Sequence, residues 1–283
     1  MATGRASLYG NESMKILSTE KFNSLETPKI LSQIGEVEEF IQWLPNDCTP
    51  LVSYVNTLKP DILFVGLRHQ INQFVMNGAK IVATRTTGLD HIDLEYCKKN
   101  DITVLSLRDE PEFMSTVSAT AEWTFGNMLM LLRKTGHELQ GKTLGIIGYG
   151  RIGKLLEWYA KAFGMKVIHC DKQSVPSLQN LTAFNLLKES DIVSLNITAD
   201  EENRGYMNRA WFEAMKQGSW FINSARDWLV DPEALKWALE NRLAGAWSDF
   251  PEHQAGKTIE SLIKTEEFLA NKLVKYVNDR NNS

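Results

Sequence analysis

The chain has 283 residues, enough for two ordinary domains or one large domain with a well-buried core. Its 31 Lys and Arg residues and 35 Asp and Glu residues give a formal net charge of −4, and 43% of all residues are hydrophobic. This mild acidic balance argues against a partner such as nucleic acid or a membrane surface, because binding either would need a basic face. A small anionic substrate remains compatible with it, since a few local cations are enough to bind one.

Cysteine usage and the N-terminal segment bear on where the protein works. Cys48, Cys97 and Cys170 are widely spaced and form neither a CxxC pair nor a metal-ligand spacing, so we expect a reducing, cytoplasmic location and no metal site. No apolar run approaches the roughly 18 residues that a membrane-spanning helix needs. Residues 1–13 are polar, without the apolar segment of a secretory signal, and are predicted to be a disordered leader.

From Met14 onward, short strand-like runs alternate with helical patterns, which is typical of parallel sheets with crossover helices. In chain order the predicted strands are Lys15–Ser18, Ile62–Gly66, Lys80–Thr84, Thr103–Ser106, Thr143–Gly148, Lys166–Cys170, Asp191–Asn196, Ser219–Ser224 and Ala244–Ser248. The predicted helices include Ala121–Lys134, Lys154–Phe163, Arg209–Met215, Pro232–Asn241 and the amphipathic segment Lys257–Tyr276. Asp231 is placed to cap the helix that begins at Pro232.

The strongest motif is an apolar strand from Thr143 that leads into a Gly-x-Gly-x-x-Gly turn, followed at once by a helical pattern. Gly148 permits the tight turn, Gly150 lets the backbone approach a pyrophosphate, and Gly153 allows close packing of helix on strand. The next strand ends at Asp171, 18 residues after Gly153 (171 − 153), where a carboxylate can accept hydrogen bonds from the ribose hydroxyls and repel a 2′-phosphate. The motif predicts a site for NAD rather than NADP; the alternative is a Gly-rich turn beside a surface aspartate.

Seven further landmarks follow one another along the chain. They are Thr84–Asp93, Ala121–Thr124 with Leu131–Arg133, Leu139–Gly153, Ser190–Leu195, Met215–Gly218, Ile222–Asp231 and His253–Ser261. The first three resemble the substrate loop, interdomain helix and cofactor motif of the D-isomer-specific 2-hydroxyacid dehydrogenases, including the phosphoglycerate-dehydrogenase-like branch. The last two resemble that family's arginine and histidine segments, and the two between them match further landmarks of the family. The resemblance implies an α/β protein of two Rossmann-like parallel-sheet βαβ domains with a cleft between them, a homodimer, and NAD-linked interconversion of a small D-2-hydroxy acid and a 2-oxo acid.

The domain organisation follows from the motifs and the resemblance together. We predict an NAD-binding Rossmann domain over residues 119–256. Residues 14–118 and 257–283 are predicted to form a flavodoxin-like, substrate-binding catalytic domain. That domain is discontinuous because the C-terminal helix can pack back on it.

Two residues are candidates for the chemistry. Arg226 follows an apolar strand at the carboxyl edge of its sheet, so its guanidinium can hold the substrate carboxylate and donate to the carbonyl oxygen. His253 is the candidate acid and base, since an unperturbed pKa near about 6.5 suits proton transfer in both directions. The alternatives are a surface salt-bridge arginine and an exposed loop histidine. Asp227 stands where the family has glycine, which calls the backbone geometry beside Arg226 into question.

The connection between Asp249 and His253 departs most from the family, which has a longer segment there with a catalytic glutamate. Glu252 is the carboxylate left in it and is a further catalytic candidate. Neighbours on an extended chain point to opposite sides, so Glu252 need not reach the imidazole of His253. The leading hypothesis is an NAD-dependent D-2-hydroxyacid dehydrogenase. The alternative is a catalytically impaired NAD-binding paralogue or corepressor-like sensor.

The resemblance assigns the remaining binding residues. For the cofactor these are Gly148, Tyr149, Gly150, Arg151, Ile152, Gly153, Asp171, Ala225 and Asp249. For the substrate they are Arg68, Thr87, Gly88, Leu89 and Arg226. The amides of Gly88 and Leu89 can bind a carboxylate, and Arg68 stands where relatives bind the distal group of the substrate. The alternatives are an ordinary strand-to-helix turn and a solvated cation.

Overall fold

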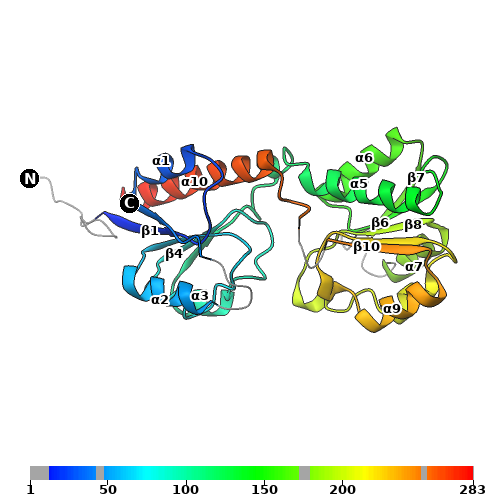
Figure 1. Ribbon diagram of the computed structural model, residues 1–283, viewed down its shortest axis with the longest axis horizontal. Coiled ribbons are helices and arrows are strands. Elements are labelled where there is room, and N and C mark those ends of the chain that lie inside the picture. The colour runs from blue at the N-terminus through cyan, green and yellow to red at the C-terminus, as the bar shows by residue number, and fades with distance from the viewer. Residues whose placement is uncertain (1–12, 43–47, 172–178, 250–253, 283) are drawn as a thin grey trace, which may run out of the picture. The chain divides into compact units, whose positions relative to one another are not determined.

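The computed structural model describes residues 13–42, 48–171, 179–249 and 254–282. The chain forms two compact units, each with its own sheet (Figure 1). Unit 1 comprises Met1–Glu112 and Ile259–Ser283, and unit 2 comprises Phe113–Thr258. No helix among the described residues is both long and apolar enough to cross a lipid bilayer.

The described part of unit 1 contains five parallel strands in the order β2-β1-β3-β4-β5. They are β1 (Met14–Ser18), β2 (Gly35–Glu39), β3 (Ile62–Val65), β4 (Ile81–Thr84) and β5 (Thr103–Leu105). Every residue of β3 and β4 is buried, as expected for apolar strands covered on both faces. The helices are α1 (Glu26–Leu31), α2 (Thr49–Leu58), α3 (Leu94–Lys99) and α10 (Ile259–Asn281), and α4 (Pro111–Met114) spans the boundary to unit 2.

The C-terminal helix belongs to unit 1, where α10 lies beside α1 on one face of the sheet while α2 and α3 lie on the other (Figure 1). Leu269, Leu273 and Val277 of α10 are fully buried. The amphipathic helix predicted over Lys257–Tyr276 is therefore confirmed, two residues later at its start and five later at its end. Ile259, the first residue of the helix, is 72% exposed.

Unit 2, in its described part, also contains five parallel strands, in the order β10-β9-β8-β6-β7. They are β6 (Thr143–Ile147), β7 (Lys166–Cys170), β8 (Ile192–Leu195), β9 (Trp220–Asn223) and β10 (Gly245–Ser248). The helices are α5 (Ala119–Lys134), α6 (Arg151–Ala162), α7 (Gln179–Glu189), α8 (Arg209–Ala214) and α9 (Pro232–Asn241), with short 3₁₀ turns at Glu201–Asn203 and Asp227–Leu229. Figure 1 shows α5 and α6 on one face of this sheet and α7 and α9 on the other.

The register of unit 2 brings the ends of its strands into one row. Ile147 of β6 pairs with Leu195 of β8, Leu195 with Asn223 of β9, and Asn223 with Ser248 of β10. The residues that directly follow these strands therefore share one sheet edge. In open α/β sheets, ligands bind at this carboxyl edge, where the order of strands reverses. The reversal lies between β6 and β8 in unit 2 and between β1 and β3 in unit 1.

The predicted fold class, α/β with parallel βαβ units, is confirmed in both sheets. The predicted cap is also confirmed, because the Asp231 carboxylate accepts hydrogen bonds from the backbone N–H groups of Glu233 and Ala234 at 3.0 and 3.2 Å. One strand was not predicted. β2 is a polar strand, largely exposed at the sheet edge, and its sequence lacks the apolar run that marks the buried strands.

Candidate active site

The glycine turn after β6 has the geometry expected of a nucleotide loop. Gly148 adopts a φ of +93°, and a Cβ there would lie 2.7 Å from the carbonyl group of Asn196. A Cβ at Gly153 would lie 2.5 Å from the Gly148 carbonyl oxygen, so α6 approaches β6 more closely than any side chain allows. These two positions therefore require glycine for the turn and for helix packing.

Gly150 has a different environment, because a Cβ built there would meet no atom within 4 Å. It is the residue that caps α6, whose first turn contains no acidic side chain. The N-terminus of this 12-residue helix carries partial positive charge and free N–H groups, and the open space at Gly150 gives a pyrophosphate access to them. The loop thus fits the dinucleotide that the sequence predicts.

Of the loop side chains, Tyr149 and Arg151 make specific contacts within unit 2. The Tyr149 ring stacks on His169 of β7 with centroids 3.6 Å apart, and its hydroxyl donates to Glu157, which raises the pKa of Tyr149. The Arg151 guanidinium donates to the carbonyl oxygen of Val117, and burial lowers its pKa. Both contacts hold the loop against neighbouring elements.

Asp171 directly follows β7 and is half-buried beside the glycine turn, whose Gly148 N–H donates to the Cys170 carbonyl at 2.9 Å. Asn196 follows β8 and was not predicted as a site residue. Its backbone contacts Gly148, and its side-chain oxygen accepts a hydrogen bond from Ser224 Oγ at 3.3 Å. A polar residue directly after an apolar strand was the signal that could have pointed to it.

Arg226 stands on a turn that a buried side chain holds in place. Asn223, 2% exposed at the end of β9, donates from Nδ2 to the Arg226 carbonyl oxygen at 2.7 Å and accepts from the Ala225 N–H at 3.0 Å. The half-buried guanidinium donates to the Ala225 carbonyl oxygen at 2.9 Å. The next residue, Asp227, is exposed and bonds to the Trp228 N–H at 2.8 Å.

The aspartate in place of glycine does not strain this turn. Within the described ranges, positive φ angles at residues other than glycine occur at Lys59 and Asp101, and Asp227 is not among them. An aspartate at position 227 therefore adopts this backbone conformation without the cost of a left-handed one.

Asp249 follows β10, next to the strand that precedes Arg226. It is 3% exposed, and burial raises the pKa of its carboxyl group, while hydrogen bonds from Gln254 and Ala255 and the nearby charge of Arg226 lower it. Its Oδ1 accepts from the backbone N–H groups of Gln254 and Ala255 at 2.9 and 3.0 Å. The carboxylate therefore joins the two flanks of residues 250–253. Glu252 and His253 themselves lie outside the described residues.

The substrate residues predicted in the N-terminal half lie at the carboxyl edge of unit 1. The Thr86 hydroxyl, just after β4, donates to the Gly88 carbonyl oxygen at 2.7 Å, and Arg108 Nε donates to the Thr87 carbonyl oxygen at 3.0 Å. The Leu89 carbonyl oxygen accepts from the Ile92 N–H at 3.0 Å. The turn is thus fixed by side chains and backbone from both ends.

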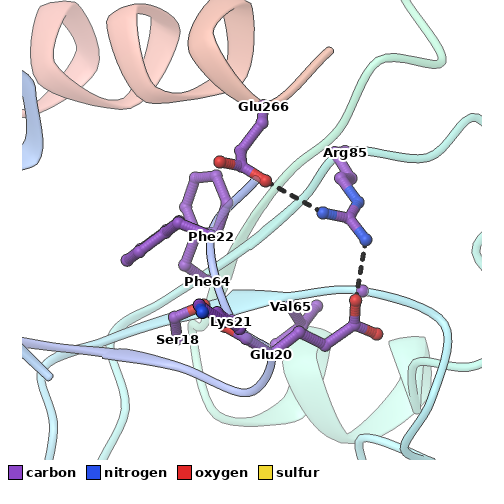
Figure 2. Close-up of a pocket in the computed structure, with 9 residues that line it drawn as sticks. Ser18, Glu20, Lys21, Phe22, Phe64, Val65, Arg85 and Glu266 are labelled. Atoms are coloured by element: carbon purple, nitrogen blue, oxygen red, sulfur yellow. Dashed lines mark hydrogen bonds and ion pairs between the residues drawn. The ribbon is translucent and has the colours of Figure 1, made fainter. Parts of the chain in front are cut away.

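Arg68 follows β3 at the same edge, exposed to solvent, and its backbone N–H donates to Glu20 at 3.1 Å. A small pocket opens beside it at the ends of β1 and β3, and Glu20, Arg85 and Glu266 are among the residues that line it (Figure 2). Within the described ranges, no group of three or more His, Cys, Asp or Glu side chains is arranged to hold a metal ion.

Comparisons with known proteins identify relatives across nearly the whole chain. Hydroxypyruvate reductase of Thermotoga maritima is 29% identical over 252 residues, which cover 82% of this chain and 78% of the relative. D-3-phosphoglycerate dehydrogenase 1 of Saccharomyces cerevisiae is 28% identical over 286 residues, which cover 91% of this chain; the chain spans 59% of that longer relative. A crystal structure of a protein from Thermus thermophilus superposes with a TM-score of 0.80 at 27% identity, covering 94% of this chain and 97% of the other.

The family model described as "D-isomer specific 2-hydroxyacid dehydrogenase, NAD binding domain" matches residues 107–272, more than half of the chain. The match includes the glycine loop, Asp171, Arg226 and Asp249. It confirms NAD as the cofactor predicted from the loop and the acidic residue after β7. The chain belongs to the D-isomer specific 2-hydroxyacid dehydrogenase family and contains that family's NAD-binding domain.

Proposed function

We propose that the protein is an NAD-dependent dehydrogenase that interconverts a small D-2-hydroxy acid and the corresponding 2-oxo acid. The observation that carries the proposal is the placement of Arg226: a guanidinium on a rigid turn at the sheet edge that also carries the glycine loop. A fixed cation at this edge suits a substrate that is itself a carboxylate.

The chemistry divides among few groups. NAD, when bound, accepts or supplies the hydride at C2 of the substrate. Arg226 holds the substrate carboxylate and donates a hydrogen bond to the oxygen on C2, where negative charge develops during reduction. His253 gives that oxygen a proton during reduction and takes one during oxidation. The amides of Gly88 and Leu89 bind the carboxylate as well, and Arg68 contacts the distal group of the substrate.

Two further features of the proposal concern the cofactor and the assembly. The Asp171 carboxylate binds the adenosine ribose hydroxyls, and Tyr149, Ile152, Ala225 and Asp249 contact other parts of NAD. We also propose that the protein acts in the cytoplasm as a homodimer, in keeping with its family and with its three cysteines, which form no disulfide. Size-exclusion chromatography with light scattering tests the dimer.

The test of the function is oxidation of NADH with a panel of 2-oxo acids: glyoxylate, hydroxypyruvate, pyruvate and 2-oxoglutarate. Turnover of at least one supports the proposal. The role of His253 in proton transfer has its own test. His253→Asn should flatten the pH dependence of kcat, and an unchanged pH profile would reject that role.

A second candidate function is an NAD-binding sensor without turnover. It is favoured by one observation: only three residues, 250–252, separate Asp249 from His253, where the family has a longer segment with a catalytic glutamate. Tight binding of NADH, measured by fluorescence or calorimetry, together with no turnover of any 2-oxo acid in the panel would select this candidate over the dehydrogenase.

A further inference from the structure

The carboxyl edge of unit 1 holds a cluster of buried charges to which the reaction as proposed gives no role. Arg85, directly after β4, donates from Nη2 to Glu20 at 2.7 Å and from Nη1 to Glu266 of α10 at 3.1 Å. Glu266 is fully buried, and the side chains of Glu20 and Arg85 are 10% and 14% exposed. Buried charges are costly unless each is bonded, so these contacts define one geometry for the three side chains.

The two carboxylates hold different parts of the unit. Glu266 accepts hydrogen bonds from the backbone N–H groups of Asn23 and Ser24, both at 3.1 Å, and from Asn23 Nδ2 at 2.9 Å. It therefore ties α10 to the segment that leads into α1. Glu266 packs the C-terminal helix against that segment and shares Arg85 with Glu20, but it does not contact the backbone of Arg68.

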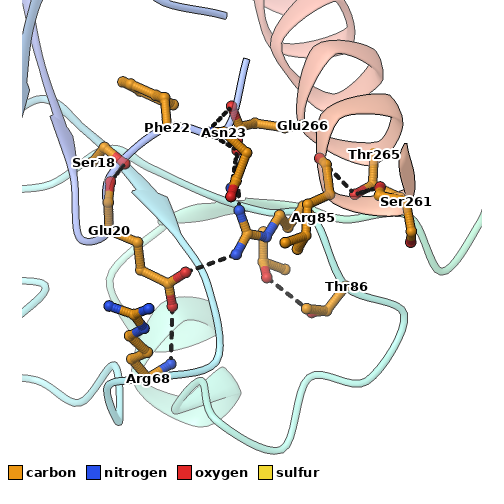
Figure 3. A network of polar contacts seen from close by, with 12 residues as sticks. Ser18, Glu20, Phe22, Asn23, Arg68, Arg85, Thr86, Ser261, Thr265 and Glu266 are labelled. Carbon is orange, nitrogen blue, oxygen red and sulfur yellow. Dashed lines mark hydrogen bonds and ion pairs between the residues drawn. The ribbon is translucent and has the colours of Figure 1, made fainter. Parts of the chain in front are cut away.

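Glu20 instead joins the two segments that we assign to the substrate. Its Oε1 accepts from the Arg68 backbone N–H at 3.1 Å while its Oε2 accepts from Arg85, the residue that leads into the turn of Gly88 (Figure 3). It does so beside the pair β1 and β3, where the order of strands in unit 1 reverses. Ligands of open α/β sheets bind at such points, so Glu20 occupies the place where a supporting residue has most effect.

The backbone beneath Glu20 leaves room for this contact. A Cβ at Gly66, directly after β3, would lie 2.3 Å from both the carboxyl carbon and Oε1 of Glu20. The atoms in the way are the tip of a flexible side chain, so a methyl group at Gly66 would displace the carboxylate and leave the strands in place. The glycine is what allows Glu20 to reach the Arg68 amide.

We propose that Glu20 is a positioning residue for substrate binding, which fixes the backbone of Arg68 and, through Arg85, the turn of Thr87, Gly88 and Leu89. The inference rests on the proposed function, because it assumes that these segments bind the 2-oxo acid. In this role Glu20 acts through Arg68 and Arg85, and it determines how well the groups that bind the substrate are aligned before binding.

The first test compares Glu20→Gln with Glu266→Gln. A glutamine replaces one carboxylate oxygen by an NH₂ group, which donates and cannot accept, so Glu20→Gln cannot keep the Arg68 and Arg85 contacts that the two oxygens make separately. Glu266→Gln weakens a bond to the same Arg85 and leaves the Arg68 contact intact. We expect KM for the 2-oxo acid to rise roughly tenfold or more in Glu20→Gln, with kcat and the Kd of NADH changed less than about threefold. KM in Glu266→Gln should stay within about twofold of wild type.

A second variant, Gly66→Ala, keeps the charge of Glu20 and moves its carboxylate. Gly66→Ala should displace the Glu20 carboxylate and raise KM in the same direction as Glu20→Gln, with the thermal midpoint little changed. Equal increases of KM in Glu20→Gln and Glu266→Gln would overturn the inference, because the effect would then follow the loss of any Arg85 ion pair. An unchanged KM in both Glu20→Gln and Gly66→Ala would overturn it as well.

Hydrogen–deuterium exchange provides a readout that does not depend on turnover. Glu20→Gln should speed exchange of the amides at 66–70 and 86–90, and Glu266→Gln should speed exchange at 22–26 instead. If no 2-oxo acid is turned over by the wild type, the proposed function fails while this comparison still decides the positioning role. Unchanged exchange at 66–70 in Glu20→Gln contradicts that role whatever the activity.

Discussion

Gly148 and Asn196 are in backbone contact across the point where the strand order of unit 2 reverses: a Cβ on Gly148 would lie 2.7 Å from the Asn196 carbonyl carbon and oxygen. The contact joins the loop after β6 to the loop after β8. It leaves the N-terminus of α6 open at Gly150, two residues further along. Gly148 is therefore required for the fold, and Gly150 leaves the helix N-terminus accessible to the cofactor.

Alanine substitutions should separate these two roles. Gly148→Ala introduces both a clash and a left-handed conformation, so we expect it to lower the free energy of unfolding by about 2 kcal/mol or more. Gly150 has an ordinary φ of −80°, and a Cβ there would meet open space, so the unfolding midpoint of Gly150→Ala should stay close to wild type. The Kd of NADH should rise by about tenfold in this variant, because the methyl group occupies the approach of the pyrophosphate. Thermal unfolding and NADH titration check both; unaltered NADH affinity in Gly150→Ala would contradict the loop assignment.

Asp171 offers a test of cofactor choice. If its carboxylate binds the ribose hydroxyls and repels a 2′-phosphate, Asp171→Ala should reduce the preference for NADH over NADPH by roughly 10- to 100-fold, the range expected from losing hydrogen bonds to a charged group. The affinity for each cofactor, measured by fluorescence titration, gives the ratio. The same ratio in the variant and in wild type would reject the ribose contact.

His69 should make unit 1 sensitive to mild acid. The side chain is 5% exposed, its ring edge packs on Phe40, and burial lowers its pKa, with the Arg68 charge acting in the same direction and Glu20 against it. The unfolded chain then binds a proton near pH 6.5 while the folded chain does not, so stability is full above that pH and decreases as pH falls below it.

Because His69→Phe removes this imidazole alone, the difference between wild type and variant over the interval from pH 7 to pH 5 reports its contribution. The loss of thermal midpoint over that interval should be smaller in His69→Phe than in wild type. Losses of equal size would show that His69 does not carry the effect.

The sequence predicted most of the fold because most strands are buried and apolar. β3 and β4 of unit 1 and β8 and β9 of unit 2 are buried at every residue, and such runs between turns are recognisable without a structure. β2 escaped prediction because an edge strand is stabilised by its partner: Gly35–Glu39 pairs along its whole length with β1, and that pairing leaves little trace in its own composition.

The residues of the candidate site likewise fall into those that a local sequence pattern predicts and those that it does not. The glycines and Asp171 belong to one motif, and its spacing along the chain predicts them. Arg226 was predicted from its place directly after an apolar strand together with the resemblance to the family. Glu20 and Asn196 act through contacts with residues far away in the sequence, Glu20 with Arg68 and Arg85, and Asn196 with Gly148. No local pattern predicts which loops of a sheet will meet, because that is decided by strand order and register.

The measurement that tests the central claim most directly is steady-state NADH oxidation by wild type, Arg226→Lys and Arg226→Ala with the best 2-oxo acid of the panel, alongside the Kd of NADH for each. Losing a paired, charge-assisted hydrogen bond that strengthens in the transition state should lower kcat/KM by roughly 100-fold or more in Arg226→Ala, and Arg226→Lys, which keeps the charge without the planar fork, should recover only part of it. NADH affinity should remain within about threefold of wild type in both variants. Turnover by wild type that survives intact in Arg226→Ala would contradict the account.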